Sequence, residues 1–330
     1  MVPISRIIKF GVLGTASVAK KYVFRAIATM SEKFELAAIA SRDKNKALQY
    51  TREYGGQPFE GYEDLIHCKD IDAVYVPLPN SLHYEWIRKA IESGKHVLAE
   101  KPLACSYEQT KELCDLAFEK KLVLMENFQF RFHPQTQYIK DVMQSGALGE
   151  IRCFRSSFGF PPLDRDNIRY KKELLSGALL DAGAYPVKAT HCFCSGEYVV
   201  AASELSVSTE LGVDLWGNAM LVNRNENIVS QISFGFDNYY QCNVELWCSK
   251  GKITANRIFT APPGFEAKVI IETAAGIQEK SFVDNHFTNM LEYFYDIVDK
   301  GLYSSEIGDN IKQSKVIQEI REKALIFRIS

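Results

Sequence analysis

The sequence predicts an α/β protein made of two domains, and three observations support that fold class. Strand-like and helix-like segments alternate as far as about residue 125, which is typical of a doubly wound parallel sheet. A glycine turn follows the first strand. Beyond Phe128, strand-like runs follow one another directly, which indicates an α+β domain with a large, mostly antiparallel open sheet. We therefore expect one domain over residues 1–125 and a second over residues 126–330.

The composition is that of an ordinary globular protein, and it excludes some classes of partner. The 330 residues are 46% hydrophobic and 24% charged, with a formal net charge of -2 and no long basic run, so we expect no nucleic-acid partner. The chain enters an apolar strand at once, without a signal-peptide pattern, and has no later apolar run long enough to span a bilayer. We expect a cytoplasmic protein without a membrane partner.

The eight cysteines are scattered along the chain. The one close pair, Cys192 and Cys194, has neither CxxC nor CxxH spacing. We expect reduced core thiols rather than disulfides or metal ligands, and no metal site.

A strand over residues 7–14 ends in a turn that indicates a dinucleotide-binding, Rossmann-type domain. Gly14, Ala16 and Ala19 form the pattern G-x-A-x-x-A where this strand passes into a helix. Small residues at these positions let backbone N–H groups approach a pyrophosphate at the helix N-terminus. Because alanine replaces glycine at the second position, a turn that binds no phosphate remains an alternative. The expected cofactor contacts in the turn are Gly14, Thr15, Ala16, Ser17 and Val18.

The end of the second strand, over residues 34–40, bears on the choice between NAD and NADP. An NAD enzyme places an acid here for the ribose 2′-hydroxyl, whereas this chain has Ser41 and Arg42, which can bind a 2′-phosphate. Lys46, in the following helix, is included in the expected cofactor site. Ser41 or Asp43 can also cap that helix, and both interpretations can hold together. We expect NADP(H) rather than NAD(H).

A short apolar run over residues 96–99 ends abruptly in Glu100, Lys101 and Pro102. It follows a helix that closes in a glycine, so it indicates a parallel strand with Lys101 at its carboxyl end, where open α/β sheets bind ligands. We expect Glu100 and Lys101 in the cofactor crevice. An isolated tripeptide of this kind can also be a surface junction with a solvated lysine. The loop after the preceding strand supplies three further candidates for the same crevice, Pro79, Asn80 and His83. A lone histidine such as His83 is more often a structural hydrogen-bond donor.

The remaining predicted elements are identified by their patterns alone. The expected strands cover residues 71–76, 122–127, 151–159, 199–208, 216–222, 228–236, 241–248, 252–255 and 267–272. The expected helices include residues 60–66, 105–120, 179–194, 286–300 and 310–326.

These motifs together resemble the glucose-fructose oxidoreductase / inositol dehydrogenase / MocA superfamily. The resemblance rests on the Glu100-Lys101-Pro102 run, the P-N-x-x-H pattern that ends at His83, and residues 180–185, and it extends from about Arg6 to the C-terminus. Most members carry histidine where this chain has Tyr185. That difference is typical of a branch with glucose-fructose oxidoreductase, dihydrodiol and xylose dehydrogenases, and ketoreductases of nucleotide-linked sugars. The likeness to the sugar 3-ketoreductases lies in residues 124–128, 133–135, 157–162, 166–170, 177–181, 184–186 and 240–247.

The resemblance implies a hydride transfer between NADPH and a keto group, with Tyr185 as proton donor and Lys101 as the cation that stabilises its phenolate. Asp181 lies one helical turn before Tyr185 and either orients substrate hydroxyls or caps the helix. Arg169 suits a bidentate contact with a pyrophosphate, and Tyr170 lies beside it. Two further candidates either stack on a nucleotide base or pack within a strand, namely Tyr239 and Tyr240.

Three functions therefore remain open. The first is NADPH-dependent reduction of a keto group on a nucleotide-linked sugar in deoxysugar biosynthesis. The second is NADP-dependent oxidation of a free sugar or a dihydrodiol, and the third is a non-catalytic NADP-binding sensor or regulator. The sugar, the base, the carbon reduced and the stereochemical outcome do not follow from the sequence. The open sheet face needs a cover, so we expect a homodimer or a homotetramer formed through it.

Overall fold

The computed structural model describes residues 6–330, and these residues form two compact units. The first unit contains the chain up to residue 127 together with residues 287–311, and the second contains residues 128–286 and 312–330. The expected domains of residues 1–125 and 126–330 differ from this division chiefly in the segment 287–311. No helix in the described part of the chain has the length and apolar content needed to span a membrane.

The first unit is built on a six-stranded parallel sheet with the order β3-β2-β1-β4-β5-β6. The strand order reverses between β1 and β4, as the doubly wound prediction requires. The strands are β1 (Ile8–Leu13), β2 (Phe34–Ser41), β3 (Gln57–Glu60), β4 (Ala73–Val76), β5 (His96–Glu100) and β6 (Leu124–Asn127). The helical segments are η1 (Ala19–Val23), α1 (Phe24–Thr29), α2 (Lys44–Tyr54), α3 (Glu63–His67), α4 (Asn80–Glu92), α5 (Tyr107–Glu119) and α8 (His286–Asp299).

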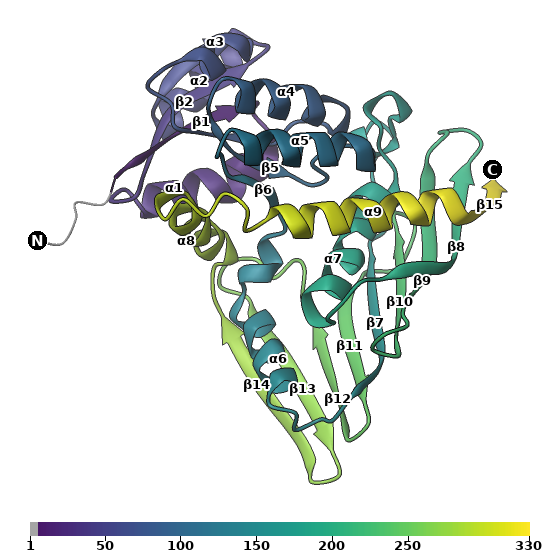
Figure 1. Cartoon of the computed structure of the whole chain (residues 1–330). Helices are drawn as coiled ribbons and strands as arrows, with labels where there is room; N and C mark the ends of the chain where they lie inside the picture. The colour runs from purple at the N-terminus through teal and green to yellow at the C-terminus, as the bar shows by residue number, and fades with distance from the viewer. Residues whose placement is uncertain (1–5) are drawn as a thin grey trace, which may run out of the picture. The chain divides into compact units, whose positions relative to one another are not determined.

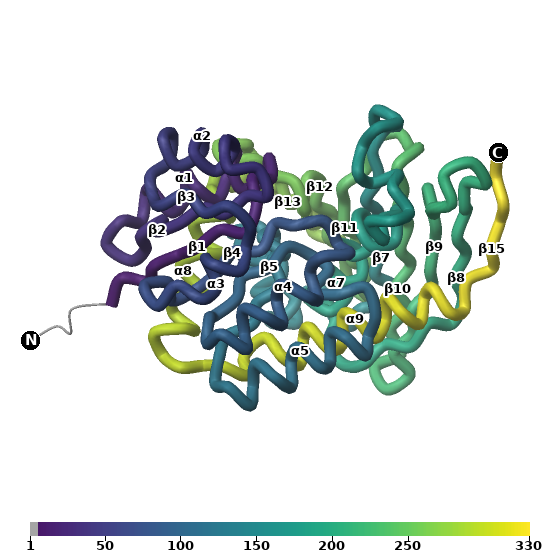
Figure 2. Tube along the Cα trace, turned by 90° about the horizontal axis from the view of Figure 1, so that it is seen from above, coloured from purple at the N-terminus to yellow at the C-terminus, as the bar shows by residue number. Residues whose placement is uncertain are grey.

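Apolar side chains on both faces of this sheet explain why the strands are almost continuously hydrophobic. Helices α3, α4 and α5 cover one face, and α4 and α5 lie side by side (Figures 1 and 2). On the other face, Phe294 of α8 lies 5.4 Å from Phe10, and Tyr295 lies edge-on to Phe34 at 5.6 Å between ring centroids. These contacts, which join segments distant in sequence, place residues 287–311 in the first unit. The sequence pattern alone did not predict them.

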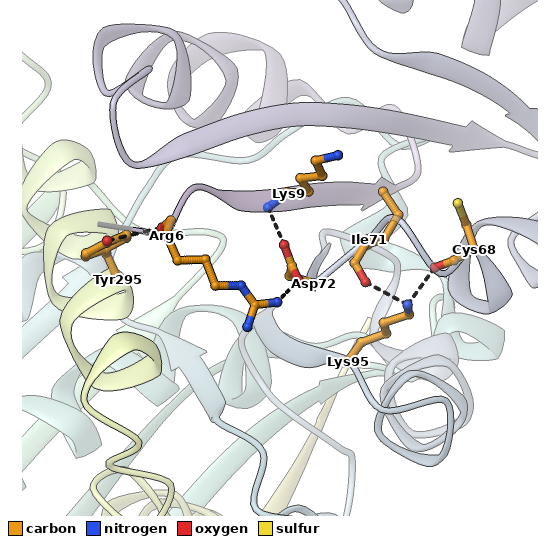
Figure 3. A network of polar contacts seen from close by, with 7 residues as sticks. All are labelled: Arg6, Lys9, Cys68, Ile71, Asp72, Lys95 and Tyr295. Carbon is orange, nitrogen blue, oxygen red and sulfur yellow. Dashed lines mark hydrogen bonds and ion pairs between the residues drawn. The ribbon is translucent and has the colours of Figure 1, made fainter. Parts of the chain in front are cut away.

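A polar network closes the amino-terminal end of this sheet (Figure 3). The Lys95 ammonium is almost fully buried and donates to the backbone carbonyls of Cys68 at 2.6 Å and Ile71 at 2.7 Å. Asp72 accepts from the backbone N–H of Lys9 at 2.9 Å and forms an ion pair with Arg6. Hydrogen bonds to a charged donor contribute about 1.5–3 kcal/mol each, so Lys95 fastens the segment that leads into β4.

The second unit is built on a nine-stranded sheet with the order β14-β13-β12-β11-β7-β10-β9-β8-β15 (Figure 1). The β7–β10 and β8–β15 pairs are parallel and the other pairs antiparallel, so the sheet is mostly antiparallel, as predicted. The strands are β7 (Ile151–Gly159), β8 (Val199–Ser208), β9 (Asp214–Asn223), β10 (Ile228–Gly235), β11 (Gln241–Cys248), β12 (Gly251–Asn256), β13 (Glu266–Thr273), β14 (Gly276–Val283) and β15 (Ala324–Ile329).

Helices cover one face of the second sheet. Helix α7 (Ala184–Phe193), continuous with the π-turn η5 (Leu179–Gly183), packs on β7 and β10, and α6 (Pro134–Gln144) packs on β13 and β14. Helix α9 (Ile307–Lys323) leads into β15, and short 3-10 turns are η2 (Gln129–Phe132), η3 (Ile168–Tyr170) and η4 (Lys172–Leu174). On the opposite face, Arg155 forms an ion pair with Glu245 and lies 5.4 Å from the ring centroid of Trp247, which is 53% exposed.

Four elements differ from the sequence predictions. The predicted helix 310–326 is wrong at its end, because α9 stops at Lys323 and residues 324–329 pair with β8 as an edge strand. Leu325, Ile326 and Phe327 in that strand are 63%, 45% and 45% exposed, so no core pattern marks them. Strands β3 and β14 were not predicted because neither has an alternating buried face, and α6 was not predicted at all.

His96, which is partly buried, makes the stability of the first unit sensitive to acid. Its Nδ1 accepts from the Val123 backbone N–H at 3.0 Å, and burial, together with the charge of Arg6, lowers its pKa to about 4 against the partial opposition of Asp72. A folded pKa below the unfolded value of about 6.5 means that the stabilisation is complete above pH 6.5 and is lost as the pH falls towards 4. The loss approaches about 1.4 kcal/mol per pH unit.

We predict that His96→Asn, which keeps an acceptor for Val123 but cannot titrate, weakens this pH dependence. Urea unfolding of both proteins between pH 7 and pH 4.5 measures the slope, and His67→Asn, at a side chain that is 67% exposed, is the control. Identical slopes for wild type and His96→Asn would contradict the assignment.

Candidate active site

The turn after β1 has the conformation that a dinucleotide phosphate requires. Gly14 has a φ of +106°, and its N–H donates to the carbonyl of Ala40 at 2.8 Å. A Cβ at Gly14 would lie 3.0 Å from the Leu78 side chain, so only glycine fits without a shift. Ala19 is fully buried where the helical run begins. The turn therefore brings the segment Thr15, Ala16, Ser17 and Val18 to the carboxyl edge of the sheet, where its N–H groups can hold a pyrophosphate.

The end of the neighbouring strand β2 carries Ser41 and Arg42, the residues predicted to bind the 2′-phosphate. Asp43 caps α2 by accepting from the Asn45 N–H at 2.9 Å, whereas the buried Ser41 hydroxyl oxygen accepts from the Asp43 N–H at 3.2 Å. The helix cap is thus Asp43. Arg42 is exposed, as is Lys46 in the first turn of α2. At the end of β2, where an NAD enzyme has an acidic residue, this chain has Ser41 and Arg42. These side chains suit a 2′-phosphate.

Tyr62 is a component of this corner that the sequence did not reveal. Burial raises the pKa of its phenol, and the nearby Arg42 guanidinium opposes that rise. The Tyr62 ring packs edge-on against Trp86 at 4.9 Å between centroids, and its hydroxyl lies 4.0 Å from the ideal Cβ position of Gly14. Tyr62 therefore lies between the glycine turn and Arg42.

The carboxylate of Glu100, which is half-buried, positions Lys101. Glu100, at the end of β5, accepts from the Tyr75 hydroxyl at 2.6 Å and from the Asn127 side-chain amide at 2.7 Å. Tyr75 and Asn127 are fully buried and belong to β4 and β6, the strands on either side. Lys101 follows directly, half-buried, and the Lys101–Pro102 peptide is cis. Glu100 thus fixes the level at which the ammonium of Lys101 leaves the sheet.

His83 contacts the backbone on both sides of this site, at Leu78 and at Pro102. Its ring is fully buried, with Nδ1 at 2.6 Å from the Pro102 carbonyl and Nε2 at 2.7 Å from the Leu78 carbonyl. Burial lowers the pKa of His83, the two carbonyls oppose that change, and Lys101 adds to it. Both ring nitrogens are therefore directed at backbone oxygens, which favours a structural role over the predicted cofactor contact. Pro79 and Asn80 lie at the start of α4 on the intervening loop.

In the second unit, Tyr185 lies within a box of aromatic rings. Its side chain is 9% exposed, and the centroids of four phenylalanine rings lie between 5.1 and 6.2 Å from its own: Phe128, Phe130, Phe158 and Phe259. Gly183 permits this placement, because a Cβ there would lie 2.9 Å from the Phe234 ring. Contacts on several sides fix the phenol ring in one orientation.

Asp181 and Arg169 form an ion pair beside Tyr185. The Asp181 carboxylate accepts from Nε of Arg169, and Asn167 Oδ1 accepts from the Arg169 backbone N–H at 3.1 Å. Asp181 raises the pKa of the Arg169 guanidinium, with smaller contributions from Tyr185 and Tyr170. The second unit therefore brings together four of the predicted residues: Asp181, Arg169, Tyr170 and Tyr185.

The other two predicted substrate residues differ in their surroundings. Tyr239 is 92% exposed, whereas the Tyr240 hydroxyl lies 2.7 Å from the Thr260 hydroxyl and accepts from Nη1 of Arg257 at 2.9 Å. Arg257 was missed in the sequence, where it is one of many charged residues after a strand. Lys188, one turn beyond Tyr185, was also missed; it is buried, and its ammonium lies 5.4 Å from the ring centroid of Phe128.

All eight cysteines are free thiols, and five of them are buried. Among residues 6–330, no group of three or more His, Cys, Asp or Glu side chains is arranged to hold a metal ion.

Comparisons with known proteins identify the family. Residues 8–128 match the family described as "Oxidoreductase family, NAD-binding Rossmann fold", and residues 136–254 match the GFO/IDH/MocA C-terminal domain. A dTDP-3,4-didehydro-2,6-dideoxy-alpha-D-glucose 3-reductase from Actinomadura kijaniata is 37% identical over 96% of both chains. A reductase of the same name from Saccharopolyspora spinosa is 41% identical over 83% of this chain and 82% of its own.

A solved structure is similar over nearly the whole chain. The 3-ketoreductase KijD10 from Actinomadura kijaniata, in complex with NADP and TDP-benzene, superimposes with a TM-score of 0.94 at 36% identity, covering 98% of this chain and 100% of that one. Solved variants of that protein replace one tyrosine by phenylalanine and one lysine by alanine. The glycine turn, the Glu100-Lys101-Pro102 corner and the helix that carries Tyr185 thus occur in a chain that belongs to the GFO/IDH/MocA family of oxidoreductases.

Proposed function

We propose that the protein reduces a keto group on a nucleotide-linked sugar, with NADPH as the hydride donor and Tyr185 as the proton donor. The observation that carries the proposal is a single phenol held rigidly by four phenylalanine rings beside an Asp181–Arg169 pair. The relatives named as dTDP-sugar 3-reductases support the substrate class. The experiment that tests it follows NADPH oxidation with dTDP-, UDP-, GDP- and CDP-keto-hexoses generated in situ.

The roles of the residues follow from the charge that develops during reduction. NADPH supplies the hydride when bound, and the carbonyl oxygen of the sugar then gains negative charge that needs a proton. Tyr185 donates that proton. A free phenol has a pKa of about 10, so the donor needs a neighbouring cation to stabilise its phenolate, and Lys101 has this role. The proposal requires that Lys101 and Tyr185 meet around one substrate.

The cofactor is assigned from the corner formed by Ser41, Arg42 and Tyr62. A buried hydroxyl, an exposed guanidinium and a phenol suit a 2′-phosphate, whereas none of them suits the ribose 2′-hydroxyl as well as an acid would. Complexes of KijD10 with NADP support the same choice.

Oxidation of a free sugar is the second candidate, because a D-xylose 1-dehydrogenase (NADP(+)) from Haloferax volcanii is 33% identical over 83% of this chain. A free-sugar enzyme needs no nucleotide subsite. Inhibition by free nucleoside diphosphates would therefore favour the sugar-nucleotide reductase. A non-catalytic sensor has no use for Lys101 together with Tyr185, and measurable turnover would exclude it.

We propose a homodimer or homotetramer that assembles through the exposed face of the second sheet, and a cytoplasmic location in which the free thiols stay reduced. Trp247 and Met220 on strands β11 and β9 are 53% and 39% exposed, and a second copy of the sheet is the natural cover for apolar side chains of this kind.

Arg42→Ala should weaken NADPH binding about 10- to 100-fold, the effect of losing one charge-assisted phosphate contact, while NADH affinity changes less than about threefold. Fluorescence titration of both cofactors measures the two affinities. Arg52→Ala, at an exposed arginine of α2, is the matched control. Equal NADPH and NADH affinities in the wild-type protein would exclude the NADP assignment.

Tyr185→Phe removes one hydroxyl and keeps the ring within its box, so turnover should fall roughly 10²- to 10⁴-fold, while NADPH affinity stays nearly unchanged. Lys101→Ala should reduce both turnover and NADPH affinity, because a charge and a cofactor contact are lost together. Single-turnover kinetics with NADPH measure both, and Tyr138→Phe on α6 is the control. Near wild-type turnover in Tyr185→Phe would assign the proton to another donor.

Trp247→Glu should lower the mass measured by light scattering from a multiple of 37.4 kDa to that of a smaller species, because it places a charge within the proposed interface. Leu302→Glu, at a residue 49% exposed in the first unit, should leave the mass unchanged. A wild-type mass of one chain at micromolar concentration would rule out the oligomer.

A further inference from the structure

We infer that Arg257 is the residue that binds the diphosphate of the substrate, an inference that rests on the proposed sugar-nucleotide reduction. The sequence suggested Arg169 for this contact. The surroundings of the two guanidinium groups in the second unit favour Arg257 instead.

Arg169 already has an anionic partner. Its guanidinium is ion-paired with Asp181 and also lies 3.5 Å, at Nη1, from the Asn167 side-chain oxygen. A diphosphate would have to compete with a carboxylate that is itself mostly buried. In the described part of the chain, the Arg257 guanidinium contacts Tyr240 and Phe265, and neither is an anion. Arg257 therefore retains its charge for a ligand.

The Arg257 side chain is ordered by aromatic stacking. The guanidinium carbon lies 4.7 Å from the Tyr240 ring centroid and 5.4 Å from that of Phe265, and Nη1 donates to the Tyr240 hydroxyl at 2.9 Å. A guanidinium carries five N–H donors, and the hydrogen bond to Tyr240 uses one of them. A guanidinium edge matches two oxygens of a diphosphate, and ordering it in advance reduces the entropy lost on binding.

The backbone of Arg257 is unusual as well. Its φ is +57°, in the left-handed region that a residue with a long side chain rarely adopts. Such conformations cluster at ligand sites, where a specific side-chain direction outweighs the strain. Here the turn directs Arg257 onto Tyr240 while the next two residues, Ile258 and Phe259, enter the core with no exposure.

The position of Arg257 suits the geometry of a nucleotide-linked sugar. Arg257 follows the end of β12, and Tyr240 precedes β11, which pairs with the end of β7 through Gln241 and Gly159. Phe259, two residues beyond Arg257, contacts the Tyr185 ring at 5.4 Å between centroids. One phenylalanine therefore connects the proposed proton donor with the loop that carries Arg257. A hexose whose keto group is at Tyr185 has its diphosphate one sugar ring away.

The test is titration calorimetry of the full chain with dTDP, UDP, GDP and CDP, and with the monophosphate and nucleoside of the base that binds best. Asn tolerates the left-handed conformation, so Arg257→Asn should keep the melting temperature of the wild type. We expect it to bind the diphosphate about 10- to 100-fold more weakly, to bind the nucleoside as the wild type does, and to bind NADPH unchanged.

Arg257→Lys keeps the charge and loses the fork, so an intermediate loss is expected, and it serves as the test if Arg257→Asn does not fold. The matched control is Arg224→Asn, at an exposed arginine in the turn between β9 and β10. A diphosphate affinity in Arg257→Asn within twofold of the wild type would overturn the inference and leave the proposed function intact. A wild-type protein that binds NADPH but none of the four diphosphates would overturn both.

Discussion

The arrangement of the nucleotide-binding unit depends on the hydrogen bonds of the Glu100 carboxylate. It accepts hydrogen bonds from Tyr75 and Asn127, which stand at the ends of the two flanking strands. Both of these side chains are fully buried, so replacing either by an apolar side chain would remove a hydrogen bond to a charged oxygen. Three parallel strands therefore end at one level, and Lys101 leaves the sheet at a defined point. His83 then ties the following Pro102 to the loop after β4 through two backbone carbonyls.

The substrate unit achieves comparable rigidity by different means. Tyr185 is positioned by apolar rings from η2, β7 and the loop after β12, segments that are distant in sequence. Gly183 lets the helix that carries Tyr185 approach β10 closely enough for those rings to meet it. Contacts with these rings on several sides orient the Tyr185 ring by packing.

Local motifs predicted the fold class and supplied the candidate site residues, and long-range packing explains most of what they missed. The glycine turn, Ser41–Arg42, Lys101 and the Asp181–Tyr185 spacing are each read within a few residues, and the two sheets followed from the order of segments. The return of α8 to the first unit depends on Phe294 and Tyr295 meeting Phe10 and Phe34, which no local pattern encodes.

Other candidate residues were missed because what distinguishes them is their neighbours in space. Tyr62, Lys188 and Arg257 look like ordinary residues of a helix start, a helix interior and a strand end. Their significance appears only when Arg42, Phe128 and Tyr240 are seen beside them. Strand β15 was missed for a different reason. It is an exposed edge strand, and its apolar residues follow helix α9 without a break in the sequence pattern. Sequence patterns thus identify candidate residues that lie within one short motif. They do not identify residues whose neighbours come from distant parts of the chain.

The charges near Tyr185 in the second unit bear on its proposed role as a proton donor. Arg169 is ion-paired with Asp181, and the ammonium of Lys188 lies over the ring of Phe128. The Phe128 ring in turn packs perpendicular to the Tyr185 ring, with 5.4 Å between centroids. Each cation is thereby fixed in position by an anion or by an aromatic face. A dipole or charge that is already oriented before the substrate arrives needs no reorganisation when the oxyanion forms, which is the main source of electrostatic catalysis. In the proposed reaction the phenol therefore acts through its fixed orientation, and Lys101 supplies the charge that its ionised form requires.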